Sequence, residues 1–180
     1  MTVSAVLREL LSRPGELLIR QWNWKSALFS SIIRALIFLI ANLTAGWRAA
    51  AGATLAEFVF RAVTSGFFGS FTQAFRTVEP AALATLTLLI LLPLISHSLE
   101  LAVHFAAGTP NLARSMISSV IFTEIAVLFN LYAMRRGALV VGENATSMSS
   151  DLRRIPALIG GFLLSGPIAL ARMAKRREQI

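Results

Sequence analysis

Both histidines of the chain lie in one short stretch, with a carboxylate between them. His97, Glu100 and His104 are spaced so that they share one face of a helix. Imidazole and carboxylate groups inside membranes often relay protons, and the same groups bind zinc, iron or manganese. A third role is structural, because Pro93 is expected to kink this helix and to free a carbonyl that the stripe can satisfy. The spacing predicts a polar stripe in the outer half of a membrane helix.

A metal site in this stripe would need a ligand from another helix. Glu100 and His104 can reach one ion together, with Glu124 as the third ligand. His97 and His104 are about 10 Å apart along the helix axis, so a single ion shared by both would be strained. The chain has no Cys, which excludes thiolate metal sites and covalently attached haem within this chain. No cofactor is predicted.

Four further charged residues are predicted near the middle of apolar helices: Arg34, Glu57, Arg61 and Glu124. Each costs about 2.5–3.5 kcal/mol at the centre of a membrane helix, so these side chains must face one another or water. Glu57 and Arg61 are four residues apart in the favourable order, which leaves Arg34 for Glu124. The pattern predicts an intramembrane polar cluster. It acts as a neutral structural clamp, as an ion or proton path, or as the docking site of a partner subunit.

The composition places the chain in a membrane. Apolar residues make up 56% of the 180 residues and charged residues only 14%, against about 45–50% and 25% in soluble domains. The formal net charge is +8, but the basic residues sit mostly at the ends of apolar runs. That placement suits anionic lipid headgroups on the cytoplasmic side and argues against nucleic acid as a partner. We expect a multi-pass membrane protein with a cytoplasmic N-terminus.

The predicted fold is all-α, a bundle of four transmembrane helices, with five as the alternative. The N-terminal part has apolar residues at helical spacing, is interrupted at Pro14-Gly15, and reads as an amphipathic surface helix. Four apolar segments have about the 20 residues that a span requires, at 26–45, 49–71, 81–104 and 113–134. The predicted parts are an interfacial segment (1–25), the bundle (26–135), a cytoplasmic basic loop (136–154), and a C-terminal apolar segment with a basic tail (155–180).

The last apolar run, at 155–171, is short for a span and contains Gly160-Gly161 and Gly166-Pro167. Basic clusters flank it on both sides, and a fifth span would move the final cluster to the outer side. Because basic residues belong on the cytoplasmic side, the charge rule favours four spans. The run is then expected to be broken and either re-entrant or interfacial.

No motif in the sequence indicates an enzyme. A nucleophile elbow, a phosphate-binding glycine loop and a paired catalytic carboxylate motif are all missing from the sequence. The preferred function is therefore an accessory, assembly or structural membrane subunit. The alternative is a small oligomeric transporter or channel that uses the Glu, Arg and His residues as an ion or proton path, and a membrane metal-binding protein comes third. A homo-oligomer or a partner membrane subunit is expected.

Overall fold

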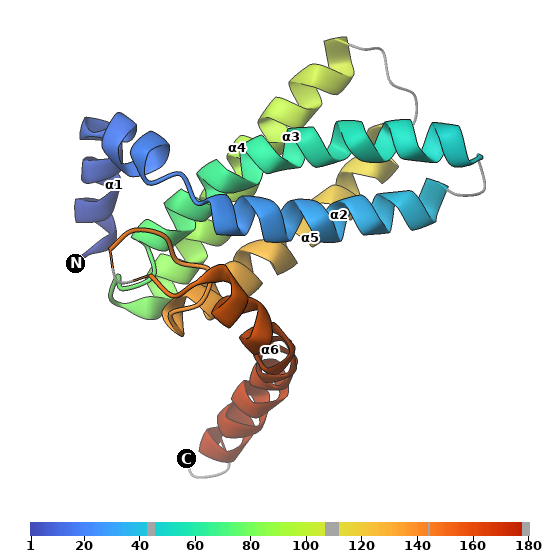
Figure 1. Ribbon diagram of the computed structural model, residues 1–180. Coiled ribbons are helices and arrows are strands. Elements are labelled where there is room, and N and C mark those ends of the chain that lie inside the picture. Colours follow the sequence, from blue (N-terminus) through green and yellow to red (C-terminus); the bar gives the residue numbers. More distant parts are fainter. Residues whose placement is uncertain (43–45, 107–111, 144, 178–180) are drawn as a thin grey trace.

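The computed structural model describes residues 1–42, 46–106, 112–143 and 145–177. These residues form helices and no strand, which confirms the all-α prediction. The elements are α1 (Val3–Ser12), the π-helical turn η1 (Gly15–Arg20), α2 (Trp24–Asn42), α3 (Trp47–Ala74), α4 (Ala81–Ala106), α5 (Leu112–Arg135) and α6 (Met148–Arg177). Figure 1 shows α2 to α5 as a splayed bundle, with α1 across one end and α6 extending away from it.

One helix in the described residues has the length and composition of a membrane span by itself. The stretch Ala81–Leu99 of α4 has a mean hydropathy of 2.0, and only 28% of its most apolar window is buried inside the protein. By this measure the described part of the chain supports one span, and the expectation of four or five is not supported. α4 also continues through Pro93 without ending there.

α2 and α3 form a close antiparallel pair because glycines on α3 leave room for α2. The backbone N–H of Asn23, beside the start of α2, donates to Ser70 Oγ near the end of α3, at 2.9 Å. A Cβ at Gly69 would lie 2.6 Å from Ser26 Cβ, and one at Gly66 would lie 2.0 Å from the indole of Trp22. Small residues therefore set the distance between these two helices.

We expect Gly66→Ala to destabilise the protein by about 1–3 kcal/mol, the usual cost of overpacking. The new methyl group would displace Trp22, whose Nε1 donates to the Val63 carbonyl at 3.4 Å. The matched control is Gly160→Ala in α6, where no described neighbour lies within 4 Å of the added carbon. That change should be neutral or stabilising by up to about 1 kcal/mol, because alanine favours helices. Thermal unfolding in detergent measures both, and equal shifts would contradict the close contact.

The N-terminal segment has the predicted break but not the predicted surroundings. α1 ends at Ser12 and η1 starts at Gly15, as the Pro14-Gly15 pair indicates. The apolar face of α1 is covered by protein, because Val6 and Leu10 are buried in a cluster with Phe75, Val78 and Leu88. This cluster lies at the α3–α4 connection, and α1 shields the apolar side chains of that connection from the surroundings. α1 therefore packs on the bundle, whereas the sequence suggested a helix lying on lipid.

The C-terminal segment differs most from the expectation. α6 begins at Met148, inside the predicted loop, and is continuous to Arg177 through both glycine-containing breaks. Ser147 explains the early start, since its Oγ accepts a hydrogen bond from the Ser150 N–H at 3.3 Å, as a helix cap does. Within α6, glycine and proline weaken or bend a helix without having to end it. Ile155 and Leu158 pack against Ala133 and Leu139, which attaches the first half of α6 to the bundle.

Candidate functional site

The two arginines of the predicted midplane cluster share a cavity. Arg34 of α2 and Arg61 of α3 line a space of about 310 Å³ that is bounded by α2, α3, α5 and α6. Its walls are mainly apolar and aromatic, with Phe68, Phe129 and Phe162 among the lining residues. The cavity thus combines an apolar lining with two cationic groups that the sequence placed at one depth.

Each arginine has a distinct environment in this cavity. The Cζ atom of Arg34 lies 5.6 Å from the ring centroid of Phe122, in cation–π range. Arg61 is only 8% exposed. Asn130 also lines the cavity, and its Oδ1 is buried and accepts no hydrogen bond from the described residues. The site can therefore offer positive charge and an acceptor to a polar group that enters from an apolar phase.

The described residues do not show the two acidic residues of the predicted cluster, Glu57 and Glu124, together with the arginines in this cavity. Glu124 is half-buried on α5 and does not line the cavity. It is close enough to His97 of α4 for their charges to interact. The Glu57 side chain lies outside the described residues, so the four-residue cluster as a whole stays a prediction. The expected Arg34–Glu124 pair likewise stays a prediction.

The outer polar stripe is described only at its inner end. His97 is half-buried on α4, while the side chains of Glu100 and His104 lie outside the described residues. Among the side chains that the structure does describe, no three His, Asp or Glu residues come together in a way that could hold a metal ion. The metal-binding alternative, with Glu100, His104 and Glu124 as ligands, therefore stays a prediction.

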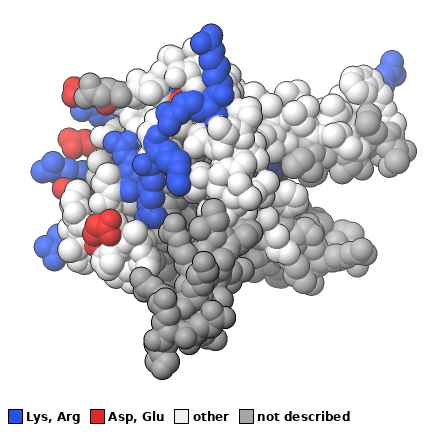
Figure 2. All heavy atoms as spheres, turned by 90° about the horizontal axis from the view of Figure 1, so that it is seen from below, with Lys and Arg blue, Asp and Glu red and all other residues white. Residues whose placement is uncertain are grey.

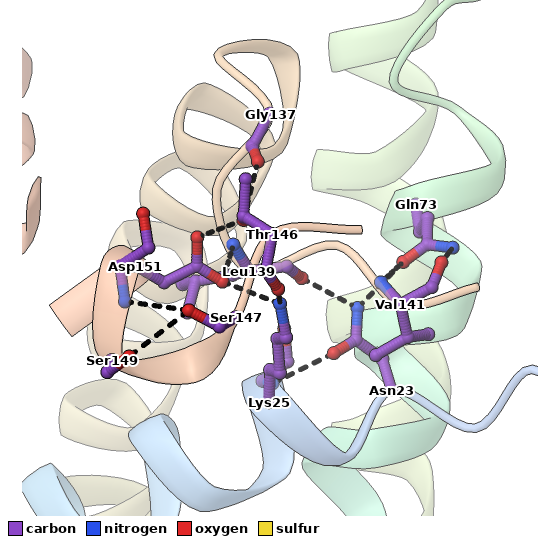
Figure 3. A network of polar contacts seen from close by, with 12 residues as sticks. Asn23, Lys25, Gln73, Gly137, Leu139, Val141, Thr146, Ser147, Ser149 and Asp151 are labelled. Carbon is purple, nitrogen blue, oxygen red and sulfur yellow. Dashed lines mark hydrogen bonds and ion pairs between the residues drawn. The ribbon is translucent and has the colours of Figure 1, made fainter. Parts of the chain in front are cut away.

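A second polar centre, which the sequence reasoning missed, is an ion pair inside the protein (Figure 3). Lys25 Nζ lies 2.7 Å from Asp151 Oδ2, and their side chains are 3% and 0% exposed. Lys25 also donates to the carbonyl of Thr146. Asp151 accepts two further hydrogen bonds, from the Leu139 N–H at 3.2 Å and from the Thr146 hydroxyl. The carboxylate is therefore surrounded by donors, as a buried charge requires.

Two amides extend this centre to α3. Asn23 Nδ2 donates to the Leu139 carbonyl at 2.9 Å and to Gln73 Oε1 at 3.0 Å. Gln73 pairs with the backbone of Val141 in both directions, donating from Nε2 and accepting at Oε1, each at 2.9 Å. The network fastens the 137–147 connection to the start of α2 and the end of α3. The role of this network is structural, because its described polar groups form their hydrogen bonds with one another.

Lys25 directly precedes the predicted span 26–45 and is one of the basic residues at the ends of apolar runs that were expected to meet lipid headgroups. The structure corrects the environment of this side chain. An interfacial lysine exposes its ammonium group, whereas Lys25 is nearly fully buried beside Asp151. The one sequence feature that could have indicated a buried ion pair is Asp151, an acidic residue between a serine-rich helix start and the basic pair at 153–154. A lone carboxylate in a basic segment indicates a local partner, but nothing in the spacing identifies Lys25 as that partner.

The fold and these two centres define an all-helical protein with a polar interior. Comparison of the chain with protein-family models, with curated proteins and with solved structures finds no significant match. The function of this protein is therefore inferred from its residues and their geometry.

Proposed function

We propose that this chain is a multi-pass helical membrane protein without an enzymatic centre, with its N-terminus in the cytoplasm. In this proposal it is an accessory, assembly or structural subunit of a membrane complex. The observation that carries the proposal is that long apolar stripes face outward on the helices, while several polar side chains are buried between them.

Long apolar stripes face outward on three helices. They comprise Ile32, Leu36 and Ile40 on α2, Leu55, Val59 and Val63 on α3, and Leu86, Ile90 and Leu94 on α4. Members of each stripe are three or four residues apart, so each stripe is one continuous helical face. Soluble monomers rarely expose contiguous apolar patches larger than a few hundred Å². In a lipid bilayer these apolar faces can stay exposed, because the surrounding hydrocarbon is apolar too.

Polar groups lie inside the same helices. Ser31 on α2, Arg61 on α3, Ser96 on α4 and Thr123 on α5 are all buried. Charged residues lower the average hydropathy of α2 and α3, yet Arg34 and Arg61 both face the interior cavity. This arrangement supports four spans, α2 to α5, where average hydropathy alone selects only α4.

The charge distribution supports the orientation. Figure 2 shows most of the blue, basic side chains of the visible face toward one end, while the described surface toward the other end is mainly white, with one blue side chain at its tip. The basic end includes Arg76, Arg135 and Arg136 at the ends of α3 and α5. Basic residues stay on the cytoplasmic side during insertion, so this end is the cytoplasmic one in the proposal.

α6 supports the role of a subunit. Its second half extends away from the bundle in Figure 1, and Leu163 and Leu164 are 66% and 61% exposed. A helix that leaves its own bundle offers these apolar side chains to lipid or to a neighbouring chain. The surface is suited to holding an assembly together.

The topology can be tested without first removing cysteines, because the chain has none. We expect Thr77→Cys and Ser149→Cys to react with an impermeant maleimide only from the cytoplasmic side, and Arg48→Cys only from the outer side. All three positions are exposed and lie near helix ends. Sealed vesicles of both orientations provide the measurement, with carbonate extraction as the control for membrane integration. Labelling of all three from one side, or release by carbonate, would contradict the proposal.

A transporter or channel is the second candidate, and the interior cavity is the observation that favours it. A space of about 310 Å³ lined by the buried Arg61, the half-buried Arg34 and an amide oxygen that accepts no hydrogen bond from the described residues could pass or hold an ion. Ion flux into liposomes that is lost in Glu124→Gln, but kept in the outward-facing Leu55→Ala, would select this function over a structural subunit.

A further inference from the structure

A second cavity lies where α3 and α5 end, at the basic end of the molecule. It measures about 390 Å³ and is lined by residues 76–77, by residues of the 134–140 segment, and by Glu143 and Ala145. α3 ends at Ala74 and α5 at Arg135, so both helices deliver an arginine to the wall of this cavity. Neither the midplane cluster nor the Lys25–Asp151 network contributes to its lining.

The two arginines of this cavity differ in how they are held. Arg135 is fixed in place, because its NH1 donates to Thr85 Oγ1 at 3.4 Å and its NH2 to the Ala81 carbonyl at 3.2 Å. The half-buried Arg76 has no side-chain hydrogen bond or ion pair with any described residue. A guanidinium carries five N–H donors. The Arg76 guanidinium therefore keeps all of its donors for a ligand, and Arg135 keeps some.

The charge of the cavity is positive on balance. Its only acidic lining residue among those described is Glu143, which is exposed, against the two arginines. Glu79 is not part of the wall, because its carboxylate caps the start of α4 by accepting from the Ala81 N–H at 2.8 Å. Paired guanidinium groups suit an oxyanion with several acceptor atoms, and phosphate is one that matches the geometry of arginine.

We propose that this cavity binds a phosphate group through Arg76 and Arg135. The cavity lies beside Ala81, where the most apolar stretch of the chain begins, and this is the depth of lipid headgroups. The phosphate is then that of an anionic phospholipid, and this choice of source rests on the proposed membrane function. Free inorganic phosphate has the same binding chemistry, so the experiment includes both sources.

Purified protein in a neutral detergent is titrated with short-chain phosphatidylglycerol, with phosphatidylcholine, or with inorganic phosphate, and thermal stabilisation reports binding. We expect phosphatidylglycerol to stabilise the wild type, and Arg76→Gln to weaken this binding about 10- to 100-fold, the effect of losing a charged hydrogen bond. Glu143→Gln should bind more tightly, because it removes the opposing charge. The matched control is Arg153→Gln, an exposed arginine outside the cavity, which should bind as the wild type does.

Each outcome of this titration decides something. Equal weakening in Arg76→Gln and Arg153→Gln would mean diffuse attraction to the basic surface and would overturn the site. The absence of stabilisation by both phosphate sources would also overturn it. Inorganic phosphate that binds as well as phosphatidylglycerol, and is equally sensitive to Arg76→Gln, would establish a phosphate site but overturn the lipid as its ligand. Carbonate extraction tests membrane integration separately, so failure of the site and failure of the membrane proposal are distinguishable.

Discussion

Asp151→Asn is expected to lower the free energy of unfolding by about 3–5 kcal/mol, the loss found when one partner of a buried ion pair is removed. The substitution leaves the Lys25 ammonium group inside the protein with no carboxylate beside it, since Asp151 Oδ2 lies 2.7 Å from Lys25 Nζ. It also turns an acceptor surrounded by donors into an amide whose own N–H₂ group would face them. Reversible unfolding in detergent, followed by circular dichroism, measures the loss.

The double replacement Lys25→Met with Asp151→Leu is the informative companion. Removing both charges leaves no uncompensated ion, so its loss should be clearly smaller than the sum of the two single losses. Some loss should persist, because the Leu139 N–H then has no acceptor at that position. Glu143→Gln is the matched control, an exposed acid on the same connection, and should change stability by no more than about 0.5 kcal/mol. Strictly additive losses at 25 and 151 would mean that the pair does not act as a unit.

Leu10→Ala should cost about 2–5 kcal/mol, as other truncations of buried leucines do. Leu10 is 4% exposed and belongs to the cluster that contains Phe75 and Leu88. The adjacent Leu11 is 83% exposed, so Leu11→Ala should stay within about 0.5 kcal/mol of the wild type. The two variants remove the same atoms from neighbouring positions of one helix. Unfolding in detergent compares them, and equal losses would mean that α1 does not dock on the bundle as described.

The boundaries of the helices in the bundle could be predicted to within a few residues, because they depend on the local sequence. The predicted segments 49–71 and 81–104 correspond to α3 at Trp47–Ala74 and α4 at Ala81–Ala106. Apolar length fixes each segment, and a proline before the first turn marks the start of α4. α6 was missed because glycine and proline were read as breaks, although they only lower the stability of a helix.

The site was less predictable, because it depends on contacts between distant parts of the chain. Spacing within a helix identified Arg34 and Arg61 as interior residues, and both line the cavity of about 310 Å³ between α2, α3, α5 and α6. The same reasoning could not identify their partners, and it assigned Arg34 to Glu124 only by elimination. Lys25 and Asp151 are 126 positions apart in the sequence, and neither residue carries a periodic pattern that points to the other. Arg76 was inconspicuous for the same reason, since a cavity formed by the ends of two helices and the connections after them has no sequence signature.

The sequence distance between Lys25 and Asp151 has a consequence for the order of synthesis. The two residues are 126 positions apart, so the first is made long before the second. Ribosomes add about 5–20 residues per second, and Lys25 therefore waits on the order of 10 s for its counter-charge. During that interval the start of α2 lacks the partner that it has in the finished fold. This holds even if α2 and α3 have already packed against each other. A chain that terminates before residue 151 lacks the carboxylate that neutralises Lys25, so it cannot complete this buried ion pair.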